Sequence, residues 1–234
     1  MSAPDFSLLA KRRFGPLFVV QFLGAFNDNA LKYAMLFLVN FTLYAADPGH
    51  SAMLAAVATG VFFIPYFLFS ALAGQVADAW DKAKLVRAVK AAEVAFMAVG
   101  LAGLWLQSVP LLLLALFCMG CHSTIFGPVK YSILPQHLGP NEIMGGTGLI
   151  EAGTFLAILG GQLLPNFVPP WEAGLVATAL AMGGFVASLF VPPAPPASPG
   201  LRVDPNPLRS TRTARTRPRV TAPPFSIATA RRDL

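Results

Sequence analysis

A short polar stretch inside a long apolar run is the part of the sequence best suited to hold a charged group. The run from Phe14 to Tyr44 is long enough to cross a bilayer, because about 20 apolar residues suffice. Its middle carries an acid, a base and three amides, namely Gln21, Asn27, Asp28, Asn29 and Lys32. At about 100° per residue, Gln21, Asp28 and Lys32 share one helix face, and polar residues at this depth usually face a bundle interior or an aqueous path. The stretch therefore predicts a helix that lines a polar cavity.

Three more polar residues within apolar runs extend this candidate lining. Glu151 and Gln162 are eleven residues apart, which places them on nearly the same helix face. Lys130 lies toward the end of its run, where it either contacts a bound anion or extends its amine toward the membrane surface. Together with Asp28, these side chains could complete a polar lining.

Other polar residues in the apolar runs favour structural roles. Lys90 and Glu93 are three residues apart on one expected helix, which predicts an ion pair. His122 sits near the centre of an apolar run, where a hydrogen-bonded packing histidine is favoured over a proton carrier.

No arrangement typical of an enzyme or a metal site is found. Cys118 and Cys121 lie in an apolar run without the further ligands that a zinc site needs, so they are interpreted as packing residues. The sequence has no Ser/His/Asp arrangement in a soluble context, no phosphate-binding glycine loop, and no His-x-x-x-x-Asp block of the acyltransferase kind. We therefore predict a protein that is not an enzyme and that uses no cofactor or metal.

Composition places the chain in the membrane class. It is 55% hydrophobic and only 12% charged, with a mean hydropathy of +0.61; this excludes a disordered chain and is too apolar for most soluble domains. The net charge of +6 is concentrated in residues 11–13, 82–90 and beyond 202. Basic clusters that flank apolar runs indicate cytoplasmic membrane edges rather than a nucleic-acid partner.

Six apolar runs are separated by turns, at about residues 14–44, 52–77, 85–106, 111–134, 143–164 and 173–191. They predict an all-α integral membrane domain of six spans over residues 14–193, preceded by a cytoplasmic N-terminus of residues 1–13. The basic flanks place both termini in the cytoplasm, because the turns on the other side carry no Lys or Arg. In the fifth run, Gly146, Gly153 and Gly160 recur every seven residues and predict a helix-packing face.

Residues 194–234 change in character. A proline-rich stretch is followed, after about Arg209, by residues rich in Arg, Thr and Pro without helical or strand periodicity. One interpretation is a disordered basic tail that touches anionic lipid. The other, which we favour, is that this part of the chain comes from a shifted reading frame.

The loop between the second and third runs carries the first family resemblance. Gly74, Asp78 and Lys82 follow the pattern Gly-x-x-x-Asp-x-x-x-Arg/Lys at the end of the second run. This spacing and position resemble the signature loop of the major facilitator superfamily. The resemblance implies one six-helix half of that fold, in which the loop acts as a conformational latch between the two halves.

Two further blocks narrow the resemblance within that superfamily. The stretches 21–29 and 126–135, together with the run from Asn141 through Glu151, resemble the lysophospholipid transporter family. The similarity covers about residues 14–193. It implies inward flipping of lysophospholipids such as lysophosphatidylethanolamine across a bacterial inner membrane by alternating access. A cation such as ethanolamine could then meet Asp28, and phosphate could meet Lys130.

The resemblance also implies what accompanies such a half. Transporters of this superfamily have two six-helix halves, so we expect this chain to need a missing C-terminal half. Some family members are fused to an acyltransferase, and some also to an acyl-carrier-protein synthetase, which re-acylate the lipid. The alternative function is therefore the membrane module of a truncated transporter–acyltransferase fusion. An independent six-span protein is a third possibility, provided that the tail is native.

Overall fold

The computed structural model describes residues 6–198, 200, 201 and 203. In these residues the chain forms six long α-helices: α1 (Gly15–Leu38), α2 (Pro48–Ala79), α3 (Lys82–Trp105), α4 (Val109–His137), α5 (Ile143–Leu163) and α6 (Pro170–Leu189). Three short elements join them: the 3-10 helices η1 (Phe6–Ala10) and η3 (Leu164–Asn166), and the π-helical turn η2 (Val39–Leu43). The C-terminal unit, residues 204–234, lies outside the described residues, as does the predicted frame-shifted tail.

The helix positions agree with the expected apolar runs to within a few residues at most ends. Four helices are long and apolar enough to cross a membrane, namely α2, α4, α5 together with η3, and α6. The other two, α1 and α3, carry most of the polar residues inside the bundle. The all-helical membrane character is therefore confirmed, whereas the count of six spans stays a prediction.

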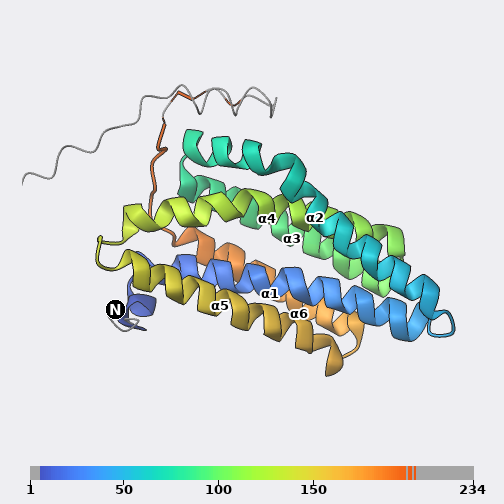
Figure 1. Ribbon diagram of the computed structural model, residues 1–234. Coiled ribbons are helices and arrows are strands. Elements are labelled where there is room, and N and C mark those ends of the chain that lie inside the picture. The colour runs from blue at the N-terminus through green and yellow to red at the C-terminus, as the bar shows by residue number, and fades with distance from the viewer. Residues whose placement is uncertain (1–5, 199, 202, 204–234) are drawn as a thin grey trace, which may run out of the picture. The chain divides into compact units, whose positions relative to one another are not determined.

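The helices of this bundle pack in the order α2–α4–α3–α6–α1–α5, so that α2 and α5 are the ends of the series (Figure 1). In Figure 1, α1 (blue) runs alongside α5 (ochre). Two clusters of buried apolar side chains fill the bundle, one around Phe14 and Ile133 and the other around Met35 and Leu116. Because α1 contacts α3, α4, α5 and α6, its polar face is held against several elements at once.

Close packing of α1 on α5 depends on the predicted glycines. A methyl group added at Gly153 would come 2.6 Å from the ring of Phe18, and one at Gly160 would come 3.1 Å from the ring of Phe26. Gly146 likewise faces Phe14 and Leu138. Phenylalanine rings of α1 therefore occupy the spaces that the glycines of α5 leave open, which confirms the predicted packing face.

The chain after α6 returns along the end of the bundle. Residues 191–198, called here the return segment, are hydrogen-bonded to the end of α4, the start of α3 and the end of α2. The side chain of Lys82 donates to the carbonyl of Pro195 at 3.0 Å, and its backbone N–H donates to Ala194 at 2.8 Å. Ser198 donates to the carbonyl of Asp78 at 3.0 Å. The first residues of the predicted tail thus have defined contacts with the bundle.

Candidate functional site

A cavity of about 480 Å³ lies between α1, α2, α4 and α5. Helix α1 contributes the predicted stripe, because Gln21, Asp28 and Lys32 all line it. The wall from α2 is aromatic and consists of Phe62, Phe63 and Tyr66. The cavity therefore combines a charged side with an apolar side, and its volume falls within the roughly 300–1,000 Å³ typical of small-molecule sites.

Asp28 lines this cavity and has one carboxylate oxygen without a hydrogen-bond partner among the described residues. Its Oδ2 accepts a hydrogen bond from Ser123 of α4 at 2.5 Å. Its Oδ1 is buried, and no donor among the described residues reaches it. Since buried polar atoms are nearly always hydrogen-bonded in native proteins, an unpaired carboxylate oxygen at a cavity wall indicates a place for an external donor.

Lys32 lies one helical turn beyond Asp28 and lines the same cavity. Its amine is 5.4 Å from the ring centre of Tyr33 and 5.6 Å from that of Phe62, in a cation–π arrangement. Among the ion pairs of the described residues, none joins Lys32 to Asp28. The predicted i,i+4 neighbours therefore share the cavity without neutralising each other directly.

The cavity is also lined by a lysine that is paired with an acid on another helix. Lys130 of α4 lines the cavity, and its amine lies 3.9 Å from the carboxylate of Glu151 on α5. The hydroxyl of Tyr131 donates to the same carboxylate. Glu151 thus reaches the cavity edge through its pairing with Lys130, and the two residues that the sequence predicted separately are brought together.

Asn27 turns away from the cavity, although Asp28 beside it faces inward. Neighbouring side chains on a helix point about 100° apart, so Asn27 meets α3 instead. Its amide nitrogen donates to Oε1 of Glu93 at 2.8 Å, and both residues are fully buried. Asn29 lines the cavity while its own amide donates to the carbonyl of Ala25.

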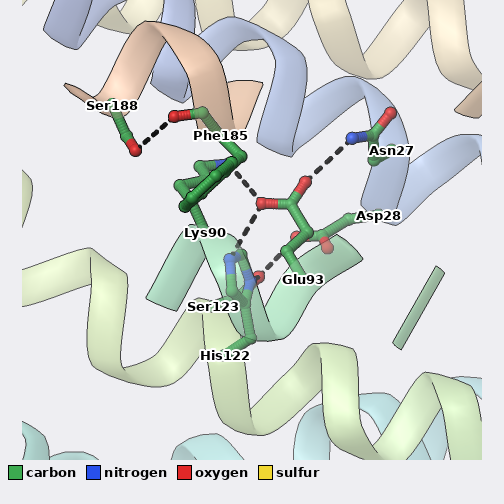
Figure 2. A network of polar contacts seen from close by, with 8 residues as sticks. All are labelled: Asn27, Asp28, Lys90, Glu93, His122, Ser123, Phe185 and Ser188. Atoms are coloured by element: carbon green, nitrogen blue, oxygen red, sulfur yellow. Dashed lines mark hydrogen bonds and ion pairs between the residues drawn. The ribbon is translucent and has the colours of Figure 1, made fainter. Parts of the chain in front are cut away.

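Figure 2 shows that Asn27 belongs to a buried network centred on Glu93. Lys90 donates to the second carboxylate oxygen of Glu93, which confirms the predicted pair. His122 joins them from α4, with its Nε2 3.0 Å from that same oxygen. Lys90, Glu93 and His122 are all at most 4% exposed, so this charge cluster lies in the interior of the bundle.

The remaining predicted residues lie elsewhere. Gln162, near the end of α5, is not among the residues that line the cavity. Of the latch residues, Lys82 is fully buried against the return segment. A methyl group added at Gly74 would meet nothing within 4 Å, so this glycine makes no close helix contact within the described part of the chain.

Sequence reasoning missed several residues that complete the site. Ser123 fixes Asp28, and Thr154 of α5 accepts a hydrogen bond from the Gln21 amide at 2.8 Å. Tyr66 lines the aromatic wall. The available signal was weak, because small hydroxyl residues in apolar helices usually bond their own backbone. Only the polar run from His122 to Thr124 inside α4 marked this part of the helix.

Comparison with known proteins agrees with the motifs and the fold. The sequence matches the Major Facilitator Superfamily over residues 17–230. This chain belongs to the major facilitator superfamily. Within it, the chain is 35% identical over 185 residues to proteins named lysophospholipid transporter LplT from Salmonella newport and Salmonella heidelberg. These matches confirm the resemblance to the lysophospholipid transporter family.

The matched region makes up different shares of this chain and of its relatives. The 185 matched residues make up 78% of this chain but only 43% of each of these Salmonella relatives. The chain therefore spans less than half the length of the transporters that it resembles.

Proposed function

We propose that this chain is the N-terminal half of a lysophospholipid transporter, which moves lipids such as lysophosphatidylethanolamine inward across a bacterial inner membrane. The observation that carries the proposal is the unpaired, buried Oδ1 of Asp28, a residue that lines a cavity with an aromatic wall. A lysolipid carries a charged head group, which cannot cross hydrocarbon unaided, on a single acyl chain. The charged side of the cavity suits the head group and the aromatic wall suits the start of the chain.

The charges on the cavity wall match a zwitterionic head group. Asp28 offers a carboxylate oxygen to an ammonium group, and hydrogen bonds between ionised partners are stronger than neutral ones. Lys130 and Lys32 supply cationic amines for a phosphate. Because Lys130 already lies near Glu151, a phosphate would compete with that carboxylate for the amine.

In this proposal the six helices all span the membrane, with both termini in the cytoplasm. Helices α1 and α3 would cross it as well, since their polar residues face other helices or the cavity rather than lipid. The latch residues Gly74, Asp78 and Lys82 would then lie on the cytoplasmic side. The basic residues of the N-terminus and of the loop after α2 support this orientation.

Alternating access requires a second half that closes the cavity from the other side. We propose that this half corresponds to the portion of the relatives that the chain does not match. The acyltransferase-fusion alternative stays a prediction from the sequence, because no feature of the described residues favours it.

Binding of lysophosphatidylethanolamine to the chain in nanodiscs tests the head-group site. We expect Asp28→Asn to weaken binding by about 10-fold or more, since a hydrogen bond to a charged group contributes about 1.5–3 kcal/mol. Lysophosphatidic acid, which lacks the ammonium group, should bind the unaltered chain as weakly as lysophosphatidylethanolamine binds the variant. Empty nanodiscs give the background from lipid partitioning.

The matched control is Glu172→Gln, which removes an acid in the first turn of α6 that does not line the cavity. It should leave binding unchanged. Equal affinity of the Asp28→Asn variant and the unaltered chain would rule out this head-group site, as would equal affinity for the two lipids.

A further inference from the structure

A continuous line of polar contacts joins the buried network to the cavity (Figure 2). It begins at Glu93, whose Oε2 lies 3.0 Å from Nε2 of His122. The other ring nitrogen, Nδ1, lies 3.3 Å from Oγ of Ser123. Ser123 in turn donates to Oδ2 of Asp28 at 2.5 Å. Two acids are therefore connected through one imidazole and one hydroxyl.

The charged groups around this line of contacts determine how many protons Asp28 and His122 hold together. On α3, Lys90 neutralises Glu93, so this fully buried pair adds no net charge. From α1, Lys32 lines the cavity next to Asp28, and from α2 the phenol of Tyr66 lines it as well. Lys32 forms no ion pair among the described residues, so its charge is not part of the line. Within the line itself, with Glu93 already neutralised, His122 and Asp28 are electrically balanced when they hold one proton between them. A buried site disfavours any other count, because an unbalanced charge in the interior is costly.

The same heavy-atom positions accommodate that proton in two ways. In the first, Asp28 is ionised, Ser123 donates to it, and Nδ1 of His122 carries a proton that points to Ser123. In the second, Asp28 is protonated and donates to Ser123, which donates to Nδ1. In both, Nε2 must carry a proton, since a lone pair 3.0 Å from the carboxylate of Glu93 would be repelled. Two short transfers through Oγ of Ser123 interconvert the two arrangements without change in net charge.

We propose that Asp28, Ser123 and His122 form a proton-binding site that holds one shared proton and releases it when a cation binds Asp28. A cation at Oδ1 of Asp28 requires the ionised carboxylate, which leaves the proton on His122. The site then carries one excess positive charge in a buried region. Loss of the Nδ1 proton restores neutrality, with His122 neutral and Nε2 still facing Glu93. Cation and proton therefore bind in competition, as an exchanger requires.

Only the identity of the cation, the ammonium group of a lysolipid, rests on the proposed function. The proton site itself can be measured without any lipid. Infrared spectra of the chain in nanodiscs, recorded against pH, report protonated carboxylic acid and imidazole separately. The variants Asp28→Asn and His122→Gln assign the two bands.

We expect the Asp28 and His122 bands to change together through the same pH interval, as interacting groups do. If one group completes its titration before the other begins, or if no Asp28 acid band appears at any pH, the proton site is overturned. Ser123→Ala should separate the two titrations, whereas Ser123→Thr, which keeps the hydroxyl, should preserve the joint change. A joint change that survives in a folded Ser123→Ala chain would also overturn the proposed path.

Ser132→Ala provides the matched control on the same helix, because its hydroxyl donates to the carbonyl of Val129, within α4 itself. It should leave the joint titration unchanged. A Ser132→Ala chain that behaved like Ser123→Ala would show that the effect reflects general loosening of α4, and so would overturn the assignment to Ser123.

Calorimetry then links the proton to the lipid. Titration of lysophosphatidylethanolamine in two buffers of different ionisation enthalpy counts the protons released, and we expect about one per lipid bound. Binding without proton release would overturn the exchange while leaving the proposed function intact. Absence of binding would count against the proposed function, and the infrared titration would still decide the proton site.

Discussion

Glu142 forms ion pairs that connect the residues before α1 to the loop between α4 and α5. It lies between α4 and α5, where Arg13 donates to its Oε1 at 2.6 Å and Lys11 lies 3.3 Å from the same atom. The backbone N–H of Gly139 donates to Oε2 at 2.9 Å. These donors stabilise the carboxylate, with the backbone bond first, and lower the pKa of Glu142 from 4.5 to about 2.

Glu142→Gln should therefore destabilise the chain in a pH-dependent way. The folded carboxylate keeps its charge down to a pH of about 2, whereas the unfolded one is protonated near 4.5. The stabilising contribution of Glu142 is thus fully present above pH 4.5 and is lost as the pH falls toward 2. Thermal unfolding in detergent, followed by helical circular dichroism, should show the two chains converging over this interval. A constant difference for Glu142→Gln across this pH interval would contradict the expectation.

At the residue scale, the sequence predicted which side chains share a helix face better than it predicted their partners on other helices. Asp28 and Lys32 could be placed on one face because helical periodicity fixes the angle between them. The hydrogen bond from the Asn27 side chain to Glu93 could not be predicted, because helical periodicity does not tell which helix packs against which face. The same limit applies to His122: the sequence predicted a hydrogen-bonded packing histidine but could not identify Glu93 and Ser123 as its partners.

At the scale of elements, helix α5 has two faces with opposite tolerance for side chains. Gly161 lies against the backbone of α1, so that an added methyl group would meet the carbonyl oxygen of Phe26 and come 2.9 Å from the nitrogen of Ala30. Gly148, on the same helix, has nothing within 4 Å of such a methyl group. The glycines of α5 therefore differ in whether they are needed for helix contact.

We expect Gly161→Ala to destabilise the chain by about 1–3 kcal/mol, because the backbone of α1 cannot move aside without loss of packing. Gly148→Ala should be neutral or slightly stabilising, since alanine favours a helix more than glycine does. Thermal unfolding of the two variants in the same detergent makes the comparison. Equal effects of the two substitutions would mean that α1 and α5 are not in close backbone contact.

Elements were the most predictable level of this structure. The apolar runs predicted the bounds of the helices closely. A run that is long enough to span a bilayer has to form a helix, because its backbone N–H and C=O groups can then hydrogen-bond to one another in the absence of water. The heptad of glycines indicated a packing face but did not identify the phenylalanines of α1 as its partners. The path of residues 191–198 was also missed, since proline-rich sequence indicates an extended backbone without indicating where that backbone lies.

At the scale of the whole molecule, the return segment ties the last helix to the loop after α2. Arg87 of α3 donates to the carbonyls of Leu189 and Val191 at 3.4 Å, and Gln136 of α4 donates to Pro195 at 3.3 Å. Val191 and Ala194 are at most 1% exposed. Lys82, one of the residues of the predicted latch, is thereby covered by a segment from more than 100 positions later in the chain.

Two shortened chains separate the contribution of the return segment from that of the residues after it. A chain that ends at Val203 keeps every contact described above and should unfold like the full chain. A chain that ends at Phe190 loses the hydrogen bonds to residues 191–198, each of which contributes about 1 kcal/mol, together with the burial of Val191 and Ala194. It should therefore unfold at a lower temperature.

Amine modification followed by mass spectrometry distinguishes the loss of this cover from general destabilisation. Lys82 is fully buried whereas Lys84, two residues later, is exposed and serves as the internal reference. Relative to Lys84, Lys82 should be modified slowly in the full chain and in the chain ending at Val203, but rapidly in the chain ending at Phe190. Similar protection of Lys82 in all three would mean that α2, α3 and α4 bury it without help from residues 191–198. The burial of Lys82 would then be independent of the chain that follows α6. The expected result instead makes exposure of Lys82 depend on the position of that segment, so that any movement of the chain after α6 changes how far the loop after α2 is covered.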